Sequence, residues 1–245
     1  MPVAIITGAS KGLGRALAAA LAGRGWDVVL DARTPRLLAE AAEALRASGT
    51  RVTALVGDVT DPAHRAALVA AAHDLGGLDL LVNNASALGA EPLVRLAELT
   101  PEGLREALET NVVAPLGLIR EALVPLRCAP AGAVIDISSD AAVEAYGTWG
   151  GYGASKAALD QLSAVLAVEE PALRVWAVDP GDLRTDLYRA AVPADPEEGL
   201  RPAPESVVPA FLRLLDARPA SGRYTAADLM AATVTEEATV SGRER

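Results

Sequence analysis

The stretch VAIITGASKGLG, residues 3–14, joins a short apolar run to a glycine-rich turn and an Ala-rich segment. The apolar run is typical of a buried parallel strand, and the Ala-rich segment is typical of a helix. Glycines allow a tight turn and the close approach of a phosphate, while a helix N-terminus offers free N–H groups. The stretch therefore predicts a strand, a phosphate-binding turn and a helix. Its spacing is G-x-x-x-G-x-G, and a purely structural turn remains an alternative.

Outside this stretch, apolar runs and helical segments alternate along the chain, and prolines lie near the starts of several helical segments. This alternation predicts an α/β fold, a doubly wound parallel sheet flanked by helices on both faces. The expected strands are Val3–Thr7, Asp27–Asp31, Val52–Val56, Leu78–Asn83, Ala133–Ser138 and Arg174–Val178, with an edge strand within Pro219–Ala226. The expected helices are Gly12–Arg24, Pro35–Ser48, Pro62–Leu75, Pro101–Arg127 and Tyr152–Glu169.

The chain has 245 residues and shows neither an internal repeat nor a linker, which predicts a single domain over residues 1–232. Residues 184–204 carry several prolines and acids and are expected to form a substrate lid with short helix. Residues 233–245 read as a polar C-terminal tail.

The net charge of −10 argues against nucleic acid or an anionic membrane as partner. A single cysteine excludes an internal disulfide, and we expect neither a signal peptide nor a membrane span, so a cytoplasmic location is predicted. His64 and His73 are expected to be solvated helix residues, and no metal site is predicted.

The chain has only two lysines among its 22 basic residues, and each falls inside a motif. Lys11 lies in the glycine-rich turn, and Lys156 follows Tyr152 by four residues. Tyr and Lys at this spacing share one face of a helix, and an ammonium favours a phenolate, lowering the pKa of the tyrosine. The pair therefore predicts an acid/base group that works near neutral pH.

With the glycine-rich turn, Asn83-Asn84-Ala85, Ser139, Tyr152-x-x-x-Lys156 and Pro180-Gly181 in this order, the chain resembles the short-chain dehydrogenase/reductase family. The resemblance covers roughly residues 3–186 and is to the compact oxidoreductase branch. It implies a Rossmann-type fold, an NAD or NADP cofactor, hydride transfer between nicotinamide and a small carbonyl or alcohol substrate, and a homodimer or homotetramer.

The resemblance also implies roles for individual residues. Tyr152 exchanges a proton with the substrate oxygen, Ser139 holds that oxygen, and Lys156 hydrogen-bonds the nicotinamide ribose. Asn111 supports a proton relay through water and the lysine. Tyr146 is a weaker rival to Tyr152, because the residue four positions later is Gly150.

Cofactor choice depends on the end of the second strand, where Asp31, Ala32 and Arg33 follow one another. In the family's alignment Ala32 takes the place of the acid that binds the ribose of NAD, and Arg33 with Lys11 suits the 2′-phosphate of NADP. NADP(H) is therefore favoured, although a shift of one residue would make Asp31 an NAD-binding acid. The residues expected at the cofactor are Gly8, Ser10, Lys11, Gly12, Leu13, Gly14, Arg33, Asp58, Val59, Asn84, Ala85, Tyr152, Lys156, Pro180, Gly181 and Thr185.

The expected substrate pocket is mostly apolar and includes Ala87, Leu88, Ala141, Val143, Trp149, Leu183 and Leu187. Ser86 stands where the family usually has glycine after Asn-Asn-Ala, which alters a turn near the nicotinamide. The leading hypothesis is an NADP-preferring carbonyl reductase or alcohol dehydrogenase. The alternative is a non-catalytic dinucleotide-sensing protein on the same fold, for which a complete catalytic set would be unusual.

Overall fold

The computed structural model describes residues 1–231, which form one α/β domain. Parallel strands make one seven-stranded sheet in the order β3-β2-β1-β4-β5-β6-β7. The strands are β1 (Val3–Ile6), β2 (Asp27–Ala32), β3 (Val52–Val56), β4 (Leu80–Asn83), β5 (Ala133–Ile137), β6 (Arg174–Asp179) and β7 (Gly222–Thr225). The strand order reverses between β1 and β4, which confirms the doubly wound Rossmann-type sheet.

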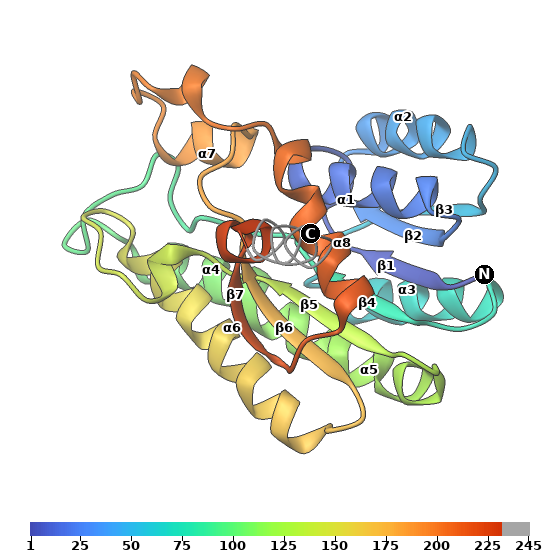
Figure 1. Ribbon diagram of the computed structural model, residues 1–245. Helices are drawn as coiled ribbons and strands as arrows, with labels where there is room; N and C mark the ends of the chain where they lie inside the picture. The colour runs from blue at the N-terminus through green and yellow to red at the C-terminus, as the bar shows by residue number, and fades with distance from the viewer. Residues whose placement is uncertain (232–245) are drawn as a thin grey trace, which may run out of the picture.

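Helices lie on both faces of this sheet (Figure 1). They are α1 (Gly12–Gly23), α2 (Pro35–Arg46), α3 (Pro62–Asp74), α4 (Pro101–Leu108), α5 (Ala114–Cys128), α6 (Gly150–Glu169), α7 (Asp186–Ala191) and α8 (Val208–Ala217). Neighbouring strand residues point to opposite faces, and both faces are buried. Ala4 and Ile6 pack with α1, α2 and α8, whereas Val3 and Ile5 pack with α3 and α5.

The structure differs from the expected helices at two places, and from the expected exposure of one histidine. A π-helical turn, Glu109–Val113, interrupts the single helix expected over residues 101–127 and holds Asn111. Helix α8 was not expected at all. His64 is not solvated, since its side chain is only 8% exposed, whereas that of His73 is 87% exposed and agrees with the expectation.

Residues 184–204 form the segment that contains α7 and projects beside the sheet at its carboxyl end (Figure 1). Thr185 begins α7 by accepting a hydrogen bond from the N–H of Tyr188. Arg201 forms ion pairs with Asp195 inside the segment and with Asp182 just before it. These ion pairs hold the two ends of the segment together. The tail expected at 233–245 lies outside the described residues.

Candidate active site

A cleft of about 310 Å³ opens at the carboxyl ends of the strands, beside the point where the strand order reverses. This is where open parallel sheets bind their ligands. Of the residues expected to be catalytic or to bind the cofactor, all line the cleft except Gly14 and Asn111. The segments that meet there come from the ends of the strands β1 to β6, together with α6 and α7.

The glycine-rich turn leads from β1 into α1 and needs glycine for two separate reasons. Gly8 and Gly12 have φ values of +64° and +57°, in the left-handed region that L side chains rarely adopt. Gly14 has no such angle, but a Cβ there would lie 2.5 Å from Asn84 Nδ2 and 2.7 Å from the Gly8 carbonyl oxygen. Gly14 therefore allows α1 to pack closely against the turn.

The N-terminus of α1 has the features of an anion site. Lys11 is its N-cap residue and makes no side-chain capping bond, and the first turn contains no acid. The free N–H groups and the positive end of the helix dipole therefore face the cleft without a competing carboxylate in that turn. The turn and the helix end fit the pyrophosphate of a dinucleotide.

The end of β2 separates the two cofactor alternatives. Asp31 is 2% exposed, and its Oδ1 accepts the N–H of Gly8 at 2.7 Å. Ala32 is also buried, and Arg33 is the first exposed residue and lines the cleft. The Asp31 carboxylate is engaged by the protein, which leaves Arg33 as the group available to a ligand.

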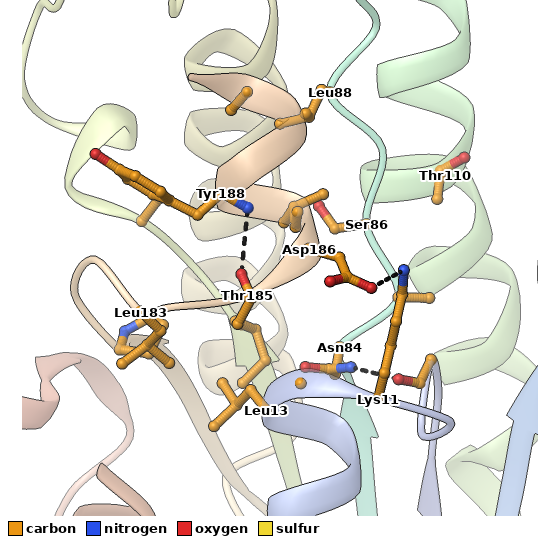
Figure 2. Close-up of a pocket in the computed structure, with 18 of the residues that line it drawn as sticks. Lys11, Leu13, Asn84, Ser86, Leu88, Thr110, Leu183, Thr185, Asp186 and Tyr188 are labelled. Atoms are coloured by element: carbon orange, nitrogen blue, oxygen red, sulfur yellow. Dashed lines mark hydrogen bonds and ion pairs between the residues drawn. The ribbon is translucent and has the colours of Figure 1, made fainter. Parts of the chain in front are cut away.

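Lys11 and Asp58 flank the adenosine end expected of this cleft. The Lys11 ammonium lies 2.9 Å from Asp186 Oδ2 at the start of α7, with both side chains about half exposed (Figure 2). Asp58 accepts hydrogen bonds from the N–H and hydroxyl of Thr60. Burial acts to raise the pKa of Asp58, but the Thr60 bonds outweigh it and the pKa is lowered. Asp58 thus also stabilises the turn that leads to α3.

Tyr152 and Lys156 lie one turn apart on α6, both nearly buried, with 7% and 2% exposed. The Lys156 ammonium donates to the Ile137 carbonyl at 2.8 Å and lies 5.5 Å from the centre of the Tyr152 ring. Burial raises the pKa of Tyr152 well above its ordinary value, and the hydroxyls of Ser86 and Ser139 only partly offset this. The expected lowering by Lys156 is therefore not found in this structure, because the desolvation of the phenol dominates.

Burial also lowers the pKa of the Lys156 ammonium, from 10.5 to about 8. The folded protein then binds this proton less tightly than the unfolded chain, so stability from this group rises as the pH increases from about 8 to 10.5. We expect the unfolding free energy of Lys156→Met to exceed that of the unmodified protein at pH 7, and the gap to narrow by pH 10. Urea unfolding of both proteins from pH 7 to pH 10 measures this difference in unfolding free energy. A difference that does not change with pH would contradict the lowered pKa of Lys156.

Ser139 follows β5 and faces the cleft. Its hydroxyl donates to Asp140 Oδ1 at 3.0 Å and accepts the N–H of Ala141 at 3.2 Å. Ser138, its neighbour, is 2% exposed. The hydroxyls of Ser139 and Ser86 both act to lower the pKa of Tyr152. Two serine hydroxyls therefore flank the phenol, of which the family pattern indicated one.

Asn111 does not line the cleft and is fully buried beside it. Its amide donates to the Ala87 carbonyl and to Ser155 Oγ, each at 2.8 Å, and its oxygen accepts from the Ala87 N–H and the Ser86 hydroxyl. Both the donor and the acceptor side of the amide are thus engaged by the protein. Asn111 ties the loop after β4 to α6 and so fixes Ser86 relative to Tyr152.

The part of the cleft beyond Tyr152 is lined by apolar and acidic groups. Leu88, Trp149, Leu183 and Leu187 line it as expected, whereas Ala87, Ala141 and Val143 do not. Tyr188 and Ala191 of α7 line it as well, and Figure 2 shows Leu88, Leu183 and Tyr188 around the opening. Asp140, Asp179 and Asp182 also line the cleft, and burial raises the pKa of Asp179 and of Asp182.

Sequence reasoning missed three features of this site: the hydroxyl of Ser86 near Tyr152, the ring of Tyr188, and His64 behind Asp31. Ser86 carried a signal, since it replaces the usual glycine. His64 and Tyr188 carried none, because their positions depend on contacts between distant segments. Within residues 1–231, no group of three His, Cys, Asp or Glu side chains is arranged to hold a metal ion.

The chain matches the family model for short chain dehydrogenase over residues 2–195. The chain belongs to the short-chain dehydrogenase/reductase family. It is 35% identical to sepiapterin reductase of Xenopus laevis over 79% of this chain and 78% of that protein. It is 37% identical to cis-4-hydroxycyclohexanecarboxylate dehydrogenase of Sinomonas cyclohexanicum over 79% of this chain and 77% of that protein.

Among solved structures, the chain resembles an alcohol dehydrogenase from Thermococcus sibiricus complexed with 5-hydroxy-NADP. The TM-score is 0.82 at 28% identity, covering 92% of this chain and 95% of that one. As a short-chain dehydrogenase/reductase, this protein is an NAD(P)-dependent oxidoreductase. No helix within the described residues of this family member is long and apolar enough to cross a membrane.

Proposed function

We propose that this protein is an NADP-preferring oxidoreductase that interconverts a small carbonyl compound and its alcohol, with Tyr152 as the acid/base. The observation that carries the proposal is the buried pair of Tyr152 and Lys156 on α6, flanked by the hydroxyls of Ser139 and Ser86 in a cleft with an open helix N-terminus. A bound nicotinamide would supply or accept the hydride.

The chain's own residues would handle the substrate oxygen. Tyr152 would donate its proton to the carbonyl oxygen during reduction and recover it from the alcohol in the reverse direction. Ser139 would hold the same oxygen with its hydroxyl, and the carbon skeleton would lie against Leu88, Trp149 and Leu187. Lys156 would hydrogen-bond the ribose of the cofactor, with its ammonium oriented by the Ile137 carbonyl.

The preference for NADP rests on Arg33. Arg33 is exposed at the cleft, while Asp31 is buried and bonded to Gly8. A guanidinium matches the geometry of a phosphate dianion, and its hydrogen bonds to the phosphate are stronger than those to a neutral hydroxyl. Lys11 would add a second positive charge once it exchanges Asp186 for the phosphate.

Arg33→Ala is expected to weaken NADPH binding by about tenfold, because a charge-assisted bond to phosphate contributes about 1.5 kcal/mol or more. NADH binding should change little, since NADH lacks the 2′-phosphate. Fluorescence titration of both dinucleotides measures the effect. Arg36→Ala on α2 is the control, because Arg36 is exposed and pairs with Glu40 instead of lining the cleft. Equal weakening of both dinucleotides would contradict the role of Arg33.

We also propose that residues 184–204 act as a lid. Ala191 packs in an apolar cluster with Leu88 and Tyr152, and Asp186 pairs with Lys11, so both ends of α7 contact the site. A homodimer or homotetramer is supported by exposed apolar side chains on α5 and α6, among them Val124 and Val168. The cytoplasmic location stays a prediction from the sequence.

The experiment that tests the proposed activity is NADPH oxidation, with NADH in parallel, over a panel of ketones, aldehydes and quinones. Turnover of a carbonyl compound with NADPH preferred over NADH would support the proposal. Tight dinucleotide binding without turnover of any panel member would favour a dinucleotide-sensing protein.

A further inference from the structure

A buried carboxylate stands directly under the glycine-rich turn. Asp31 Oδ1 accepts the N–H of Gly8 at 2.7 Å, and the main-chain oxygen of the same residue accepts the N–H of Ala9 at 2.9 Å. The Asp31 residue is 2% exposed. One residue at the end of β2 therefore binds two successive N–H groups of the turn.

The second oxygen of this carboxylate faces a histidine from another part of the chain. His64 Nε2 lies 3.2 Å from Asp31 Oδ2, and both side chains are nearly buried. An ionised carboxylate only accepts hydrogen bonds, so Nε2 carries the proton and donates it. His64 lies in the first turn of α3, whose N-cap is Asp61, and it does not line the cleft.

The neighbouring backbone leaves room for this ring. A Cβ at Gly57, just after β3, would lie 2.2 Å from His64 Nδ1. A side chain at residue 57 and the observed ring position of His64 therefore exclude each other. The absence of a side chain at Gly57 and the contact of His64 with Asp31 form one packing arrangement.

The turn is held from its other side by Asn84 at the end of β4. Asn84 Nδ2 donates to the Thr7 carbonyl at 2.8 Å, and the Thr7 hydroxyl accepts from the N–H of Asn84. Gly8, between the two supports, has a φ of +64°. Glycine adopts this region and others with similar ease, so contacts from outside the turn are what can hold Gly8 in one conformation.

We propose that Asp31 and His64 form a buried support that presets the glycine-rich turn, and that His64 is thereby a positioning residue for dinucleotide binding. This inference rests on the proposed function, in which the turn binds the pyrophosphate that NADPH and NADH share. Without the support, the turn has to be ordered when a dinucleotide binds, and the free energy of that ordering weakens the binding of NADPH and NADH alike. The effect is thus distinct from that of Arg33, which acts on the 2′-phosphate alone.

The test compares His64→Leu, which removes the donor at similar bulk, with His64→Gln, whose amide nitrogen reaches approximately the place of Nε2. Titration with NADPH and with NADH, followed by fluorescence, should show both dissociation constants raised about tenfold in His64→Leu. His64→Gln should recover most of the affinity. In steady-state assays, His64→Leu should raise KM for NADPH more than it lowers kcat.

His73→Leu on the same helix is the matched control, since that side chain is 87% exposed, and its affinities should equal those of the unmodified protein. If His64→Leu does not fold, His64→Asn replaces it, because its amide ends short of Asp31. Unchanged dissociation constants in the folded variant would overturn the inference, as would an effect confined to NADPH. If the unmodified protein binds neither dinucleotide, the proposed function fails and the inference fails with it.

Discussion

Tyr152→Phe is expected to lower kcat for carbonyl reduction by roughly 10²- to 10⁴-fold, the usual contribution of a positioned general acid. The variant removes only the hydroxyl, so the buried ring still packs against Leu88 and beside Trp149. Dinucleotide affinity should therefore stay close to that of the unmodified protein. Steady-state kinetics with the best carbonyl substrate, and NADPH titration of the same preparation, measure the two quantities.

Tyr146→Phe is the matched control for this prediction. Tyr146 lies six residues earlier, is 42% exposed and donates its hydroxyl hydrogen to Glu144. It has no lysine four residues later, and Gly150 stands there instead. Its replacement should leave kcat nearly unchanged. Equal turnover in Tyr152→Phe and the unmodified protein would mean that another group transfers the proton.

The second large effect is expected at Gly14, where a single methyl group should destabilise the fold and abolish dinucleotide binding. The added Cβ would lie 2.5 Å from Asn84 Nδ2 and 2.7 Å from the Gly8 carbonyl. Neither atom can move freely, since Asn84 is bonded to Thr7 and the carbonyl belongs to the turn. Overpacking of this kind costs about 1–3 kcal/mol, and here it also displaces the turn.

Gly23→Ala makes the same change at the other end of α1, where a Cβ would meet no atom within 4 Å. That substitution should stabilise the protein by about 0.5 kcal/mol, because glycine loses more backbone entropy in a helix than alanine. Urea unfolding of both variants therefore should give shifts of opposite sign. A Gly14→Ala protein as stable as the unmodified chain, with normal NADPH affinity, would refute the packing role.

Much of the fold follows from local pattern. The apolar runs predicted six of the strands within a residue or two at each end, because a parallel strand buried on both faces is apolar at most of its positions. The edge strand β7 also falls inside its expected range. The helix over residues 101–127 was predicted as continuous. Its periodicity gives no sign of the π-helical turn, which carries Asn111 into contacts with Ala87 and Ser155.

The candidate site likewise has features that the sequence predicted and features that it did not. The order and spacing of the motifs predicted the residues that gather at the cleft, because strand ends in a parallel sheet meet at one edge. The side-chain direction of Asp31 was not predictable. The two readings of the β2 end differ by one residue, and the contact that separates them, with Gly8, joins residues 23 apart.

The sequence by itself determined the strand–turn–helix unit and the pairing of Tyr152 with Lys156, since these depend on residues close together in the chain. It also determined the family, through the order and spacing of separate motifs. Only the tertiary structure decided that burial raises the pKa of Tyr152, that Ser86 joins Ser139 beside it, and that His64 supports the turn through Asp31. The physical reason is that solvent exclusion and hydrogen-bond partnership are set by segments that meet only after folding. The spacing of a motif indicates which side chains can react. The packing around those side chains sets their protonation and their orientation.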